Sequence, residues 1–100
     1  MSATSIMEAA ANAAAEMPNE QMNNEQIVAF ARENAGRIVQ PLIPQNATEQ
    51  QQQHMVNLQT NALIYSITAK QIDNGTYKGD GKLSENVSAF DGSILMVVYQ

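Results

Sequence analysis

Residues 46–72 read NATEQQQQHMVNLQTNALIYSITAKQI, and this stretch decides the fold. Between Arg37 and Lys70 the chain has one carboxylate, Glu49, and one imidazole, His54, and all other side chains there are uncharged. The outer face of a helix in a soluble monomer usually carries scattered Lys and Glu. A long helix without them is expected to be covered by protein, and the simplest cover is another copy of the chain.

The stretch predicts a long helix over residues 46–73, ended by Asn74-Gly75. Asn46 followed by Glu49 is a capping-box pattern that opens it. Apolar residues then alternate at spacings of three and four, which is typical of a helix that lies along another helix. Because one antiparallel neighbour covers only one stripe, the remaining apolar surface predicts contacts between subunits. The main stripe is Met55, Leu58, Ala62, Tyr65, Ala69 and Ile72, and beside it lie Val56, Thr60, Leu63, Ile64 and Ile67.

An Ala-rich helix is predicted over residues 5–17, capped by Ser5 and ended by Pro18. Its stripe is mostly alanine, so it can approach a neighbour closely but gains little from apolar burial alone. The expected stripe is Ile6, Ala10, Ala13 and Met17.

A second helix is predicted over residues 23–40, because Asn23 and Gln26 form another capping box. The segment from Pro41 to Pro44 is expected to be extended and to change the direction of the chain. The expected apolar face is Val28, Ala31, Ala35, Ile38 and Leu42, widened by Ile27, Phe30 and Val39.

Residues 76–100 predict a β tail. Residues 78–82, KGDGK, are typical of a hairpin loop, and residues 90–93 of another turn. Residues 94–99, ILMVVY, have the composition of a strand that pairs readily with other chains. The expected fold class is therefore mainly α: a helical hairpin with an Ala-rich amino-terminal helix and a small β tail, forming a single unit over residues 1–100 that assembles into a polymer.

Composition disfavours several function classes. Ten acidic and five dispersed basic residues argue against a nucleic-acid-binding surface. The absence of cysteine removes disulfides, thiolate catalysis and zinc sites of the cysteine type. His54 stands outside any recognisable catalytic pattern, and no phosphate or calcium motif occurs, so neither an enzyme nor a cofactor or metal site is expected. No stretch predicts a membrane span or a secretory signal, which favours a cytoplasmic location.

Residues 46–53, NATEQQQQ, and residues 57–67, NLQTNALIYSI, resemble the core of the RebB-like family of R-body (refractile body) proteins. In that family an Asn-Ala-rich segment leads into a Gln run and then into an Ala/Thr/Gln-rich helix with a Tyr-Ser pair, here Tyr65-Ser66. Residues 6–15 also look like the amino-terminal part of the family. The resemblance extends over residues 5–73 and is dense over residues 46–67. This helix is less Ala-rich than the family pattern, and residues 76–100 have no counterpart in it.

The resemblance implies a small non-enzymatic subunit that polymerises, alone or with a paralogous subunit, into a ribbon rolled up inside a bacterial cell. Such ribbons extend on acidification and can rupture a surrounding membrane. The Gln run is expected to supply amide hydrogen bonds at a helix–helix contact. The expected assembly residues are Met55, Leu58, Ala62, Leu63, Tyr65, Ile67, Ala69 and Ile72 on the long helix and Ile94, Met96 and Val98 in the tail.

A pH trigger requires two packings that differ in bound protons, and the packing that holds more protons gains as the pH falls. Glu49 and His54 are the main candidates for such groups, followed by the acidic residues Glu8, Glu16, Glu20 and Glu25. Two other functions fit the same composition: a phage or virion subunit that forms a closed ring or tube, and a small module that docks one helical partner.

Overall fold

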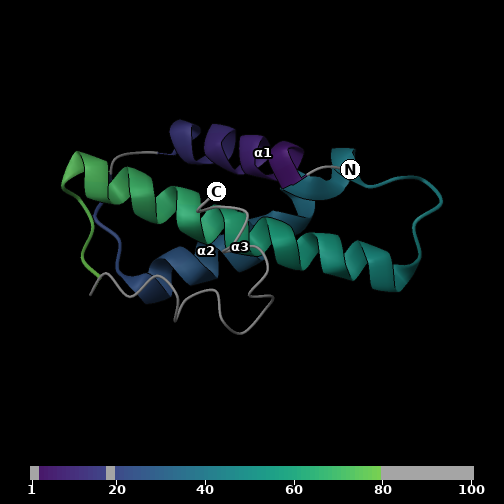
Figure 1. The fold of residues 1–100 in the computed structure, drawn as a ribbon. Coiled ribbons are helices and arrows are strands. Elements are labelled where there is room, and N and C mark those ends of the chain that lie inside the picture. Colours follow the sequence, from purple (N-terminus) through teal and green to yellow (C-terminus); the bar gives the residue numbers. More distant parts are fainter. Residues whose placement is uncertain (1–2, 18–19, 80–100) are drawn as a thin grey trace.

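The computed structural model describes residues 3–17 and 20–79. It contains three α-helices and one short 3-10 helix: α1 (Ala3–Glu16), α2 (Asn24–Val39), η1 (Gln40–Leu42) and α3 (Glu49–Asn74). Figure 1 shows their arrangement. The prediction of a mainly helical fold is confirmed.

Only residues 76–79 of the predicted β tail belong to the described part of the chain. There Tyr77 forms an isolated parallel β-bridge with Met22, and the Lys78 amide donates a hydrogen bond of 2.9 Å to the Met22 carbonyl. The complete loop over residues 78–82, the turn over residues 90–93 and the strand over residues 94–99 lie outside the described residues, and with them Ile94, Met96 and Val98.

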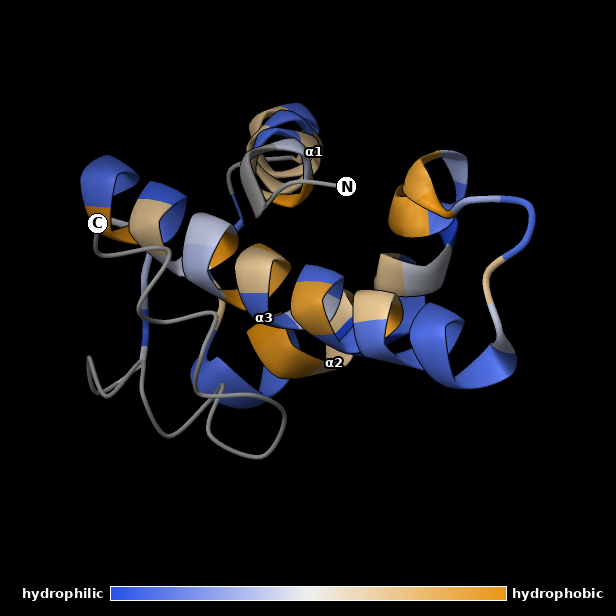
Figure 2. Cartoon of the chain, turned by 45° about the vertical axis from the view of Figure 1, so that its right-hand side comes forward, coloured by the Kyte–Doolittle hydropathy of each residue, from blue (hydrophilic) through white to orange (hydrophobic). Residues whose placement is uncertain are grey.

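The long helix α3 packs against both other helices. The bridge between Met22 and Tyr77 places the start of α2 beside the end of α3, so these two helices are antiparallel, as predicted. On α1, Ile6 contacts Gln59 and Ala14 contacts Lys70, so α1 runs in the same sense as α3. Figure 2 looks nearly along the axis of α1 while α3 extends across the view, which shows that α1 crosses α3. Two helices of the same chain, α1 and α2, therefore pack on α3, whereas the predicted hairpin had only one.

Rows of residues four positions apart form the core, the spacing expected when the ridges of two crossing helices interlock. The fully buried side chains are Ile6, Ala10 and Ala14 in α1 and Ile27, Ala31, Ala35 and Val39 in α2. The predicted stripes differ slightly from these rows. Ala14 rather than Ala13 is fully buried, and Val28 and Ile38 lie at the edge of the α2 face. Alanine at the centre of each row lets the helix backbones approach closely.

The helix termini confirm some predicted caps and correct others. Asn23 and Gln26 form the predicted capping box of α2. The prediction for α3 was wrong about the residue: Thr48, not Asn46, is the N-cap, and it pairs with Gln51 in a capping box. Thr48 with Gln51 and Asn46 with Glu49 both have the capping-box spacing, and the structure uses the first pair.

Two further boundaries differ from the prediction. The first helix begins at Ala3, so Ser5 lies inside α1 and is not its cap. After α2 the chain makes one 3-10 turn, with Pro41 in its first turn, before it becomes extended at Ile43. A proline in the first turn of a helix costs little, because the missing N–H has no partner there in any case.

Candidate assembly surface

The predicted assembly stripe of α3 is divided between the core and the surface of a single chain. Met55 and Ala62 are buried, Leu58, Tyr65 and Ala69 are half-buried, and the Ile72 side chain is 56% exposed. Leu63 and Ile67, from the neighbouring row, are fully buried. The most buried line of α3 is thus rotated away from the predicted stripe, toward the row that contains Leu63 and Ile67.

The amount of apolar surface left over is smaller than the sequence predicts. Helix α1 covers the side of α3 that α2 leaves open, and Ile6 and Ile64 meet in the shared core cluster. Within the described part of the chain, Ile72 is the one large hydrophobic side chain that stays exposed. The expectation that one chain cannot cover the apolar faces of its longest helix is therefore wrong for the described residues.

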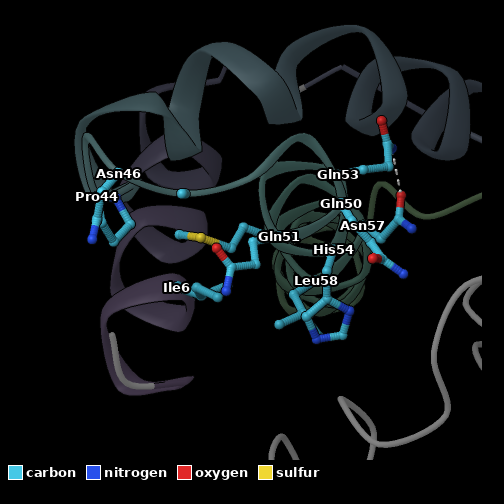
Figure 3. A pocket seen from close by; sticks show the side chains of 11 residues that line it. Ile6, Pro44, Asn46, Gln50, Gln51, Gln53, His54, Asn57 and Leu58 are labelled. Carbon is cyan, nitrogen blue, oxygen red and sulfur yellow. Dashed lines mark hydrogen bonds between the residues drawn. The ribbon is translucent and has the colours of Figure 1, made fainter.

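A groove lies at the amino-terminal end of α3, between this helix, the connection before it and the start of α1. It has a volume of about 870 Å³. Figure 3 shows Ile6 reaching into it from α1, Pro44 and Asn46 on the connection, and side chains of α3 on the other side. Of the described residues that line the groove, five are amides and none is Asp, Glu, Lys or Arg. The amides are Asn46, Gln50, Gln51, Gln53 and Asn57, and the other lining residues are Ile6, Pro44, Ala47, His54, Met55 and Leu58.

Gln50, Gln51 and Gln53 line this groove from the exposed side of α3. The Gln run is predicted to supply hydrogen bonds at a helix–helix contact, and within the described part of the chain it does not lie at one. All residues from 50 to 54 are exposed. Two of these side chains form local hydrogen bonds: Gln52 Nε2 donates to the Ala47 carbonyl at 3.0 Å, and Gln53 Nε2 donates to Asn57 Oδ1 at 3.0 Å. These bonds hold the amides in place along α3, and Figure 2 shows this end of the helix as continuously hydrophilic.

The amides that do lie between helices are ones that the sequence analysis did not single out. Gln59 and Gln71 occupy the same four-residue row as Leu63 and Ile67, so that an apolar pair is flanked by two buried amides. Gln59 Nε2 donates to the Ile6 carbonyl at 3.3 Å, while Gln59 Oε1, Thr68 Oγ1 and Gln71 Oε1 receive no hydrogen bond from the described residues. The four-residue spacing was the signal that could have identified this row.

A lysine attaches the end of α1 to α3. Lys70 Nζ donates to the backbone carbonyls of Ala14 and Met17, each at 2.7 Å. The last carbonyls of a helix have no partner within the helix and carry partial negative charge, so a cation is favourable there. With Gln59 at the other end, α1 is held by side chains of α3 that recognise its backbone.

The candidate pH-responsive groups all lie at the surface. Glu49 is the first residue of α3, and His54 lines the groove. The exposed candidates are Glu8, Glu16, Glu20, Glu25, Glu49 and His54.

The described part of the chain has neither a cluster of metal ligands nor a membrane-spanning helix. No three His, Asp or Glu side chains in residues 3–17 and 20–79 come together as metal ligands would. None of the described helices combines the length and the apolar character that crossing a lipid bilayer needs. Comparisons with protein-family models, curated proteins and solved structures give no match for this chain.

Proposed function

We propose that this chain is a non-enzymatic structural subunit that assembles with copies of itself into a ribbon of the R-body kind. In this proposal the ribbon forms in the cytoplasm of a bacterium, from this chain alone or with a paralogous subunit. On acidification it changes from a coiled to an extended form and ruptures a surrounding membrane. The proposal is supported by the resemblance over residues 46–67 and by one feature of the fold, the amide-lined groove on the exposed first turns of α3.

The position of the groove favours an open polymer. Helix α3 has 26 residues and is therefore about 39 Å long. The groove lies at its first turns, and the exposed Ile72 lies near its last turn. A contact between two unlike surfaces at opposite ends of a subunit is heterologous, and it continues indefinitely unless the rotation between copies closes a ring.

The chemistry of the groove also suits contacts between identical chains. Each Asn or Gln carboxamide offers both donors and acceptors, so an amide can pair with its own copy. Stacked Asn and Gln side chains form such ladders in ordered polymers. A surface of Lys or Glu would bring like charges together in the same arrangement. Neutral amides therefore permit self-association at a surface that is polar in the single chain.

The double variant Gln50→Glu/Gln53→Glu tests the groove as an assembly contact. Both side chains are exposed, and acidic residues in the first turns of a helix are favourable for the helix dipole, so the single chain should fold normally. Negative-stain electron microscopy and sedimentation of the purified chain are expected to show ribbons for the parent and mostly unassembled protein for the variant.

The matched control is Gln21→Glu/Gln40→Glu, which adds the same charge at two exposed amides outside the groove. This control is expected to assemble like the parent. If both double variants lose assembly equally, net charge is responsible and the groove is not the contact. If neither loses it, the groove has no part in assembly.

The small helix-docking module is the second candidate, because α1 and α2 together cover the apolar surface of α3 that suggested a polymer. Microscopy distinguishes the candidates: rolled ribbons support the first, and small uniform particles support the second. A closed ring or straight tube would support the phage or virion subunit instead.

A further inference from the structure

We infer that α1 of one copy docks on α3 of a second copy, in the place that α1 occupies within its own chain. This inference rests on the proposed self-assembly and names the element that would join the copies. The docking surface is the side of α3 that carries Gln59 and Lys70, and its occupant is α1 of another copy of this chain.

The contacts of α1 identify α3 as its binding surface. Helix α1 packs mainly on α3 and much less on α2, its neighbour in the sequence. Lys70 binds the carbonyls of Ala14 and Met17 at 2.7 Å each, and Gln59 binds the carbonyl of Ile6 at 3.3 Å. These donors recognise the backbone of a helix at both ends. A second copy offers the same helix, so the same contacts can form between chains without a new interface.

Release of α1 uncovers a surface that water can solvate in part. Only Ile6 is large among the fully buried side chains of α1, since Ala10 and Ala14 complete the row. On α3 the uncovered groups include the Gln59 carboxamide and the Lys70 ammonium. Water can satisfy both of these polar groups, whereas the apolar surface that α1 covers on α3 remains unfavourable in water until α1 of another copy covers it again.

The rest of the fold keeps its own attachments when α1 moves. Helices α2 and α3 pack on each other through Ile27, Ala31 and Ala35. Beyond α1, Met22 is bonded to Lys78 and bridged to Tyr77, which anchors the chain just before α2. In the sequence, residues 17–21 connect α1 to this hairpin. When each chain gives its α1 to the next copy and receives one from the copy before, the exchange continues along the polymer.

A pair of introduced cysteines tests this exchange in the full chain. The chain has no cysteine of its own. Met17→Cys/Lys70→Cys places one thiol at the end of α1 and one at its contact on α3. Treatment of assembled protein with a short bismaleimide is expected to give a covalent ladder of dimers, trimers and larger products on a denaturing gel. The controls Met17→Cys and Lys70→Cys, each alone, are expected to stop at dimers.

Two other outcomes have different meanings. If the assembled protein gives only monomers in which the two cysteines of one chain are cross-linked to each other, the exchange is ruled out. Self-assembly itself is not contradicted by that result. Protein that never assembles overturns the proposed self-assembly, and the exchange with it. Circular dichroism checks that the cysteine variants keep the helix content of the parent.

A second test uses an insertion that changes none of the residues packed between the helices. Insertion of Gly-Ser-Gly-Ser-Gly-Ser after Glu20 lets α1 reach its own α3 with less constraint, which favours the closed single chain. The concentration needed for assembly is expected to rise by about tenfold, as effective concentrations for intrachain contacts change with linker length. The same six residues added after Gln100 are expected to have no effect. Equal assembly of all three chains overturns the exchange.

Discussion

At the residue scale, the unusual feature is a carboxamide in the centre of the helix packing. Gln59 is fully buried, and its Oε1 receives no hydrogen bond from the described residues. A buried acceptor without a donor costs about 1–3 kcal/mol, whereas a typical hydrogen bond such as that to Ile6 contributes about 1 kcal/mol. The core therefore retains an amide where an apolar side chain of similar size would pack at least as well.

Substitution of this amide gives opposite results for two similar side chains. Gln59→Met removes the buried acceptor, and we expect the free energy of unfolding to rise by about 1 kcal/mol. Gln59→Glu buries a charge without a partner, and we expect a loss of about 3 kcal/mol or more. Urea denaturation, at a protein concentration where sedimentation shows monomers, measures both. A large loss for Gln59→Met would contradict this account of the buried oxygen.

At the element scale, α3 ends at Gly75, whose left-handed backbone conformation suits glycine better than any other residue. Gly75 has φ +72°, and its amide bonds to the carbonyls of Gln71 and Ile72. A Cβ at this position would meet no atom within 4 Å. The cost of a side chain here thus comes from the left-handed backbone itself. Gly36, inside α2, also has open space around it, but its backbone is helical.

The two glycines form a matched pair for mutation to alanine. Gly75→Ala is expected to lower the free energy of unfolding by about 1 kcal/mol, because alanine is strained at positive φ. Gly36→Ala is expected to raise it by about 1 kcal/mol, because alanine is the better helix former. Thermal denaturation should show midpoints that move in opposite directions, by about 4–8 °C each. Shifts of the same sign would contradict the assignment of Gly75 as the cap.

At the scale of the whole molecule, the proposed response to acid would depend on the proposed assembly. Every candidate carboxylate and the imidazole are exposed in the single chain. A pH-dependent change of form thus requires that contacts between copies cover some of these groups in one form and leave them open in the other.

Removal of one carboxylate tests this link in the proposed ribbon. Glu49→Gln carries a permanently neutral side chain that resembles the protonated acid. The form favoured by acid, which holds more protons, should therefore be adopted at a higher pH than in the parent. Electron microscopy of ribbons across a pH series measures the transition. Glu33→Gln, at an exposed carboxylate of α2, is the control. An unchanged transition in the Glu49 variant removes this residue from the mechanism.

Patterns of local sequence determined most of the secondary structure. The spacing of apolar residues and the neutral composition of residues 46–72 predicted the long helix, and the pair Asn23 and Gln26 predicted the start of α2. The choice of Thr48 over Asn46 was not decided by the pattern, since both carry a suitable side chain three residues before Glu or Gln. Helix formation depends on such local signals, and these are present in a single sequence.

Only the tertiary structure decided which surfaces of these helices are covered. The sequence shows that α3 has apolar residues around much of its circumference, but it does not show whether α1 or a second chain covers them. The fold places α1 across α3, buries Gln59 in the contact and leaves residues 50–54 exposed beside a groove that most of them line. Burial depends on residues more than 50 positions apart, such as Ile6 with Gln59 and Ala14 with Lys70, and no local pattern carries that information.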